Sequence, residues 1–146
     1  MEHPTESLEV LFAQICRLKH SRVQNLLEAL GLYEGQPALL RSLWEEEGLT
    51  HTELARSLHI RPATVTKMIQ RMEKSGFVEK RPDPADQRLS RVYLTSSGRS
   101  VQEAVRRVWH TLEAEAFAGF SGEERAVLQR LFRQIRENLR LASAPR

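Results

Sequence analysis

Residues 50–76 are THTELARSLHIRPATVTKMIQRMEKSG, and this stretch decides the fold. Thr50, followed three residues later by Glu53, is the pattern of a capping box and predicts the start of a short helix. Residues 59–61 predict a turn, and Pro62 suits the first position of a second helix. The stretch therefore predicts a helix-turn-helix, in which two helices meet across a tight turn.

The predicted second helix is amphipathic. Its inward face carries apolar residues at helical spacing, namely Val65, Met68, Ile69 and Met72. Its outward face is small, polar or basic, with Ala63, Thr64, Thr66, Lys67, Gln70, Arg71 and Lys74. A helix that enters the major groove of DNA, which is about 12 Å wide, needs small leading residues and polar side chains for the base edges. The outward face therefore indicates DNA reading, although other three-helix packings share this periodicity.

A hairpin is predicted directly after the helix-turn-helix. Two β-prone runs, residues 77–80 and 91–94, are joined by a loop that contains two prolines and two aspartates. Arg88 lies near the tip of this loop, and arginine is favoured in narrow minor grooves because these concentrate negative potential. We therefore expect the hairpin to act as a wing that reaches a minor groove beside the second helix.

The basic charge of the chain is concentrated in the same region. The 146 residues carry a net charge of +3, but eight basic and four acidic residues lie between Arg61 and Arg91, which gives this stretch +4 and leaves −1 elsewhere. A local excess of this kind is the electrostatic pattern of a phosphate-binding surface. An ordinary solvated face is the alternative, and the overlap with the second helix and the hairpin favours DNA.

Helices are predicted on both sides of this region. Apolar residues recur at helical spacing from residue 8 to residue 30, and Pro37 opens another helix that Gly48 closes. After the hairpin, Thr95 caps a long helix, and residues 121–124 form a second capping box that begins a last amphipathic helix. The expected fold class is therefore mostly α with a small β-hairpin wing, a winged helix-turn-helix flanked by N- and C-terminal helices.

A homodimer is expected because the first and last helices are amphipathic and the central domain is too small to cover both apolar faces. The expected interface residues are Leu8, Leu11, Phe12, Ile15, Leu128, Leu131, Phe132 and Ile135. The chain then divides into an N-terminal dimerisation arm (1–36), a winged helix-turn-helix DNA-binding domain (37–98) and C-terminal dimerisation helices (99–146), all in one compact unit. A self-contained helical layer is the alternative. A two-fold dimer suits double-stranded DNA with half-sites about 34 Å apart, or a multiple of that distance.

The sequence resembles the MarR (multiple-antibiotic-resistance regulator) family of bacterial and archaeal transcription factors. The residues that carry the resemblance are Leu54-Ala55, Arg61–Ile69, Arg71–Val78, Asp86-Gln87-Arg88 and Leu94–Gly98. The wing Asp-x-Arg, placed between a helix-turn-helix and a Leu-Thr-x-x-Gly helix start, is a fairly specific combination. The likeness in motif runs from about Gly31 to Gly98, and the flanking helices match in layout.

The resemblance implies a sequence-specific regulator, mostly a repressor, that binds a near-palindromic operator and releases it when a small ligand or an oxidant acts. It also implies that Asp86 holds Arg88 by a charge-assisted hydrogen bond while Arg88 enters the minor groove. The DNA-binding residues expected from the pattern and the resemblance are Arg61, Ala63, Thr64, Thr66, Lys67, Gln70, Arg71, Asp86, Arg88 and Arg91. Two positions depart from the family: Arg61 replaces a small hydroxyl cap, and His59 stands where glycine is frequent, although histidine tolerates a left-handed backbone.

Cys16, the one cysteine, is expected to be a buried or partly buried, inert thiol, because the peroxide-sensing branch of the family supports its cysteine with tyrosines and this chain has few. No metal and no cofactor are expected, because no histidine pair among His3, His20, His51, His59 and His110 has ligand spacing. A possible effector crevice beneath the long helices would include His20, Trp44 and Trp109. Core or dimer-wall positions for the tryptophans are the alternative.

An enzyme is not expected, because the sequence has no Gly-rich phosphate loop, catalytic triad order or metal motif. No apolar run approaches the roughly 18 residues of a membrane span, and residues 1–9 lack the pattern of a signal peptide. We therefore expect a cytoplasmic protein with no membrane partner. Two other functions stay open, a protein-docking module that does not bind DNA and an architectural DNA binder without sequence preference.

Overall fold

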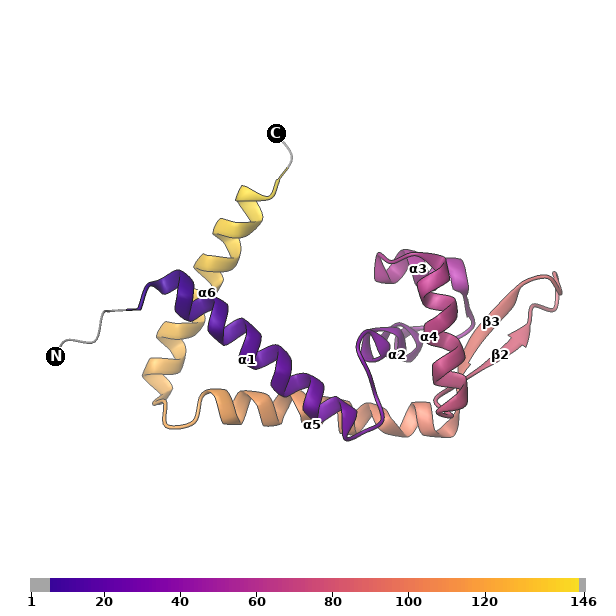
Figure 1. Ribbon diagram of the computed structural model, residues 1–146, viewed down its shortest axis with the longest axis horizontal. Coiled ribbons are helices and arrows are strands. Elements are labelled where there is room, and N and C mark those ends of the chain that lie inside the picture. The colour runs from indigo at the N-terminus through magenta and orange to yellow at the C-terminus, as the bar shows by residue number, and fades with distance from the viewer. Residues whose placement is uncertain (1–5, 145–146) are drawn as a thin grey trace. The chain divides into compact units, whose positions relative to one another are not determined.

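The structure is a computed structural model that describes residues 6–144 (Figure 1). The elements in chain order are α1 (Leu8–Glu28), α2 (Gln36–Glu45), β1 (Leu49–Thr50), α3 (His51–Leu58), α4 (Pro62–Lys74), β2 (Val78–Pro82), β3 (Ser90–Leu94), α5 (Ser96–Ala116) and α6 (Gly122–Ala142). The expectation of a mostly helical fold with a small β wing is confirmed. No helix in the described part of the chain is both long and apolar enough to cross a membrane.

The chain groups into two compact units, unit 1 up to Leu112 and unit 2 from Glu113. This boundary falls inside α5, whereas the sequence-based boundary lies between residues 98 and 99. The division of the chain by role, into dimerisation and DNA-binding parts, stays a prediction.

The core of unit 1 holds the helix-turn-helix together. Most of its fully buried side chains come from α2, α3, α4 and β3, and these include Leu39, Leu40, Leu54, Val65, Ile69, Met72 and Val92. The predicted inward face of α4 is confirmed, with Met68 half-buried at its edge. Truncation of a buried leucine in such a core costs about 2–5 kcal/mol, so the mutual position of α3 and α4 is strongly fixed.

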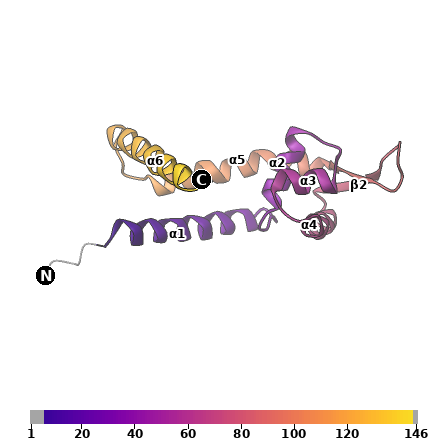
Figure 2. The ribbon, with the colours of Figure 1, turned by 90° about the horizontal axis from the view of Figure 1, so that it is seen from above.

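The sheet has three antiparallel strands in the order β1-β3-β2. Lys80 pairs with Val92 and Arg81 with Arg91 in the hairpin, while β1 adds the pairs Leu49–Val92 and Thr50–Arg91 on the other side of β3. The hairpin leaves the C-terminal end of α4 and extends beyond α3 and α4 (Figure 2). The predicted wing is therefore confirmed as a structure, and β1 is an addition that the sequence did not predict.

The helix ends follow the predicted capping residues. The hydroxyls of Thr50 and Ser121 accept from the backbone N–H groups of Glu53 and Glu124, and both capping boxes are complete. Thr95 Oγ1 accepts from the backbone N–H of Gly98 at 3.1 Å at the start of α5. These local patterns set the element boundaries to within a residue or two.

Helices α1 and α6 carry apolar side chains that no other residue between 6 and 144 covers. The exposed members of the predicted interface are Leu8, Leu11, Phe12, Ile15, Leu131, Phe132 and Ile135, and Leu128 is half-buried. No residue of α6 is buried. Exposed apolar faces of this size are typical of surfaces that a partner covers.

Candidate nucleic-acid interface

The turn between α3 and α4 sets the direction of α4. His59 ends α3 with φ at 54°. This value lies in the left-handed region, so the expectation that histidine tolerates a left-handed backbone at this turn is confirmed. Arg61 occupies the N-cap of α4 in an extended conformation, and its side chain makes no capping hydrogen bond. Pro62 begins the helix, where its missing N–H costs nothing.

The outward face of α4 is open. Exposed side chains on and just before it are Arg61, Ala63, Thr64, Lys67, Gln70, Arg71 and Lys74. The face begins with small residues and continues with long polar and basic ones, which is the order that groove entry requires. The positions of these residues agree with the sequence prediction, and their contacts with DNA stay a prediction.

Thr66 differs from the rest of that face because its hydroxyl is used inside the protein. Thr66 Oγ1 donates to the backbone oxygen of Pro62 at 3.0 Å and lies 3.1 Å from Nδ1 of His51. Since the hydroxyl has one proton, His51 Nδ1 is the donor in the second contact. Thr66 therefore helps to lock α3 against α4, a role that the sequence did not predict.

This arrangement disfavours the protonated form of His51. Its Nε2 atom is buried and has no hydrogen-bond partner among residues 6–144. Burial and the nearby Lys80 ammonium lower the pKa of His51, and Glu73 partly offsets them. A proton on Nε2 would therefore meet no acceptor and a positive neighbour.

We expect acid to weaken unit 1 through this histidine. Because the folded-state pKa lies below that of the unfolded chain, the unfolded state binds the proton first, and stability that is complete above pH 6.5 is lost as the pH falls. His51→Asn keeps a donor for Thr66 without a titrating ring, so its free energy of unfolding should depend less on pH between 7 and 5. The difference in slope is at most about 1.4 kcal/mol per pH unit, one proton.

Urea unfolding at several pH values checks this expectation. Glu73 and Lys80 face the same ring, and both remain in the variant, so their titration is common to the two curves. If the free energy of unfolding depends on pH in the same way in the wild type and in His51→Asn, His51 is not a source of the acid destabilisation.

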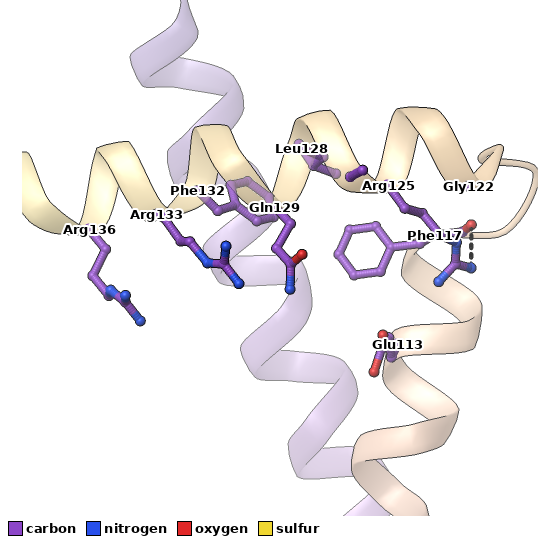
Figure 3. Close-up of a pocket in the computed structure, with 10 residues that line it drawn as sticks. Glu113, Phe117, Gly122, Arg125, Leu128, Gln129, Phe132, Arg133 and Arg136 are labelled. Carbon is purple, nitrogen blue, oxygen red and sulfur yellow. Dashed lines mark hydrogen bonds between the residues drawn. The ribbon is translucent and has the colours of Figure 1, made fainter.

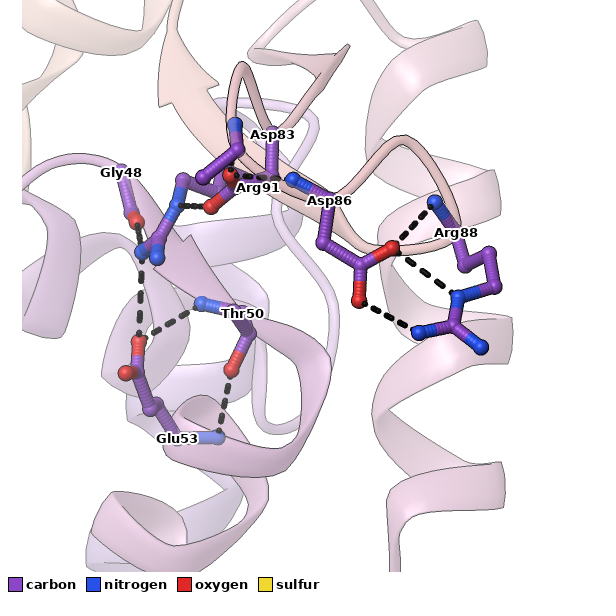
Figure 4. Close-up of polar contacts among 8 residues, drawn as sticks. Gly48, Thr50, Glu53, Asp83, Asp86, Arg88 and Arg91 are labelled. Atoms are coloured by element: carbon purple, nitrogen blue, oxygen red, sulfur yellow. Dashed lines mark hydrogen bonds and ion pairs between the residues drawn. The ribbon is translucent and has the colours of Figure 1, made fainter.

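The wing presents Arg88 to solvent in a fixed orientation. Arg88 Nε donates to Asp86 Oδ1 at 3.0 Å and Nη2 to Oδ2 at 3.2 Å, while the Arg88 backbone N–H donates to Oδ1 at 3.1 Å (Figure 4). These bonds hold the pKa of Asp86 below its usual range. The Arg88 side chain is nevertheless 90% exposed. The predicted Asp86–Arg88 pair is therefore confirmed, and its approach to a minor groove stays a prediction.

Arg91 has a different position from the other predicted DNA-binding residues. Its Nε donates to Asp83 Oδ2 at 2.5 Å and its Nη1 to the backbone oxygen of Gly48 at 2.7 Å. The guanidinium is thus directed into the base of the wing. Contact between Arg91 and DNA stays a prediction, but an internal structural role is visible that the sequence did not indicate.

Other cations near the interface are balanced by neighbouring carboxylates. Arg81 pairs with Glu79 and lies 4.3 Å above the Tyr93 ring, and Lys80 lies 3.3 Å from Glu73. No such carboxylate partner is found within the described residues for Lys67 or Arg71 of α4, which leaves positive charge on its outward face. An uncompensated positive surface of this kind attracts phosphates in general.

The three residues predicted to line an effector crevice differ in their surroundings. Trp44 packs against the core and its Nε1 donates to the backbone oxygen of Gly98 at 2.8 Å, so the core alternative holds for this residue. His20 and Trp109 are exposed. Their roles toward an effector stay a prediction.

A hollow of about 680 Å³ lies within unit 2 (Figure 3). Phe117, Phe132 and three arginines, Arg125, Arg133 and Arg136, are among the residues that line it. The rings of Phe117 and Phe132 lie 6.5 Å apart, and Arg125 donates to the backbone oxygen of Phe117 at 3.0 Å. None of His20, Trp44 and Trp109 lines this hollow, which shares α6 with the apolar face expected to dimerise.

Cys16 is exposed on α1, so the expectation of a buried or partly buried thiol is wrong for the chain by itself. Apolar residues of α1 near Cys16 are exposed as well. The sequence pattern of an exposed apolar helix face is the same as that of a buried one, so it could not reveal this exposure. Within residues 6–144, no cluster of three histidine, cysteine or carboxylate side chains is arranged to hold a metal ion. His3 lies outside the described residues.

Comparison with known proteins gives consistent matches. The model of the MarR family matches residues 32–90. The transcriptional regulator HosA of Escherichia coli O111:H- is 30% identical over 104 residues, which cover 71% of this chain and 77% of that protein. The apo form of wild-type MarR from E. coli has a similar structure, with a TM-score of 0.71 and 25% identity over 91% of this chain and 98% of that one.

Solved structures of S. aureus MepR share the same fold. One mutant of MepR has a TM-score of 0.82 and 22% identity. A second mutant, solved bound to an oligodeoxyribonucleotide, has a TM-score of 0.73 and 23% identity. Each of these two alignments covers 92% of this chain and 99% of that one.

Proposed function

Because the chain belongs to the MarR family and is a DNA-binding, helix-turn-helix transcriptional regulator, we propose that it acts as a homodimeric repressor. The dimer binds a near-palindromic operator and dissociates from it in response to a small ligand or stress signal. The proposal assigns it a binding function and no catalytic one. The observation that carries it is the exposed wing arginine, Arg88, oriented by Asp86 beside an open basic helix face.

In this proposal, α4 binds the major groove and the wing binds a minor groove. The α4 face offers small residues followed by Lys67, Gln70 and Arg71, which suit base edges and phosphates of the major groove. Arg88 has a planar guanidinium that a narrow minor groove attracts. Solved MepR bound to an oligodeoxyribonucleotide supports the same use of the fold in this chain.

The dimer in this proposal rests on α1 and α6. Both helices expose apolar side chains that nothing else in residues 6–144 covers, and an isolated chain with these faces would associate. A two-fold pair presents two copies of α4 and of the wing, which requires an operator with two related half-sites. Dimerisation and palindromic recognition are therefore one hypothesis.

Selection from a random duplex pool at physiological salt tests the proposal. We expect a near-palindromic winner that the wild type binds at least about 10³-fold more tightly than scrambled DNA in an anisotropy titration. Equal affinity for both duplexes would contradict the repressor and support an architectural role. Absence of DNA binding would contradict the proposed interface and support a protein-docking role.

Matched variants show whether α4 is the reading surface. Lys67→Ala should weaken binding to the selected site by about 1–3 kcal/mol if Lys67 reads a base. Arg130→Ala removes the same charge from the exposed polar side of α6 and should leave the affinity unchanged. Equal effects of both changes would indicate a general charge effect rather than a contact at α4.

A further inference from the structure

Asp83 is the most buried acidic group of the wing. Its side chain is 8% exposed and lies in the wing tip, which we define as residues 83–89, between β2 and β3. Its Oδ1 accepts from the backbone N–H groups of Ala85 at 2.7 Å and Asp86 at 3.1 Å, and its Oδ2 accepts from Arg91 Nε at 2.5 Å (Figure 4). These bonds, with Arg91 the strongest contributor, lower the pKa of Asp83. The carboxylate therefore stays charged and fixes the first half of the wing tip.

Arg91 extends this link to the start of α3. Its Nη1 donates to the backbone oxygen of Gly48 at 2.7 Å and lies 3.9 Å from Glu53 Oε2. That same Glu53 oxygen accepts from the backbone N–H of Thr50 at 2.8 Å, in the capping box of α3. One guanidinium thus joins the wing tip to the first turn of the helix-turn-helix.

The remainder of the wing tip is held only by bonds within itself. Ladder pairing between β2 and β3 ends at Pro82 and Ser90, and β1 pairs with β3 no further than Arg91. Beyond that point the backbone bonds are local, from Asp83 to Leu89 and from Leu89 to Asp86. The Asp86–Arg88 pair is also local, so it orients the guanidinium within the tip and not relative to α4.

We propose that Asp83 and Arg91 are positioning residues, which fix the wing tip relative to the helix-turn-helix and so bring Arg88 to the DNA groove. This inference rests on the proposed function. The contacts form a continuous series from Gly48 and Glu53 through Arg91 and Asp83 to the Asp86 amide. The Asp86 carboxylate then holds Arg88. Loss of the Asp83–Arg91 link leaves the hairpin strands paired but frees the tip, so the penalty falls on the Arg88 contact.

A double-mutant cycle on the selected duplex tests this proposal. Arg88→Ala should weaken binding about 5- to 150-fold, the range expected for loss of one groove contact. Arg91→Met should weaken it about 5-fold or more in the wild type but less than about 2-fold in the Arg88→Ala background, because its effect passes through Arg88. Asp83→Asn, which keeps the shape of the side chain, should give the same non-additive result.

Two controls separate positioning from other roles. Arg99→Met removes another arginine that pairs with a carboxylate, Glu47, outside the wing tip, and should leave binding unchanged. In the Arg88→Ala background, Arg91→Met should leave the salt dependence of binding unchanged, whereas loss of a direct phosphate contact lowers the slope by about one.

The outcomes distinguish this inference from the proposed function. Absence of selective binding by the wild type, or an Arg88→Ala variant that binds normally, contradicts the proposed interface itself. Selective binding with additive effects of Arg88→Ala and Arg91→Met overturns only the positioning role. Circular dichroism and urea unfolding confirm that each variant is folded at the temperature of the titration.

Discussion

Gly98→Ala is expected to lower the free energy of unfolding by about 3 kcal/mol, the upper part of the range for overpacking a well-fitted site. A Cβ atom at Gly98 would lie 2.1 Å from the backbone oxygen of Phe77 and 3.1 Å from a methyl carbon of Leu94. The nearer contact is with backbone, which cannot rotate away as a side chain can. The start of α5 would have to move.

That movement would break bonds on two sides of the helix start. Thr95 N–H donates to the same Phe77 oxygen at 3.1 Å, and the Gly98 oxygen accepts from Trp44 Nε1 at 2.8 Å. Both partners, Phe77 and Trp44, belong to the winged helix-turn-helix region that precedes α5 in the chain. Gly98 therefore permits the start of α5 to pack closely against that region.

Urea unfolding followed by circular dichroism measures the effect, with Gly122→Ala as the control. Gly122 lies in the first turn of α6, has nothing within 4 Å of an added Cβ, and is not in the left-handed region, so alanine should be neutral or slightly stabilising there. A Gly98→Ala variant within about 1 kcal/mol of the wild type, the size of the extrapolation error in such comparisons, would refute the close approach.

Local signals in the sequence were sufficient for the helices and their caps. Thr50 with Glu53, and Ser121 with Glu124, determine helix starts through bonds between residues three apart. Apolar spacing in α4 identifies its buried face for the same reason, since periodicity is a property of the segment alone. The Asp86–Arg88 pair, two residues apart, follows from the resemblance to the MarR family and not from spacing alone.

Long-range contacts could not be predicted in this way. Strand β1 has two residues, too few to show an alternation, and it exists because β3 offers a free edge. The contacts of Arg91 with Gly48 and of His51 with Thr66 join segments 43 and 15 residues apart, so no local spacing announces them. A basic residue in a basic stretch suggests a phosphate contact, and only the fold shows that Arg91 also bonds to Asp83 and Gly48.

The double variant Leu131→Glu, Ile135→Glu is expected to convert the protein to a monomer at micromolar concentration and to weaken binding to the selected operator by about 10²–10⁴-fold. Both side chains lie on the exposed apolar face of α6, at 43% and 39% exposure, and glutamate is a good helix former. The stability of the isolated chain should therefore change little. The free energy of dimerisation should become less favourable, because the new charges would be buried in the interface without partners.

The loss of affinity follows from how a two-fold dimer binds. Once one copy of α4 and its wing occupy a half-site, the second copy is held near the other half-site at a high effective concentration. A monomer keeps every contact of one half-site and loses this advantage. Its affinity for an isolated half-site should consequently match that of the wild type at concentrations where the wild type is also monomeric.

Arg130→Glu is the matched control, because it changes the net charge by the same amount on the polar side of the same helix. Sedimentation equilibrium gives the association state, and anisotropy gives the affinity for the full and half operators. A double variant that remains dimeric would show that α6 is not the interface. A monomer that still binds the full operator like the wild type would show that dimerisation and DNA reading are independent, and the palindromic operator would lose its physical reason.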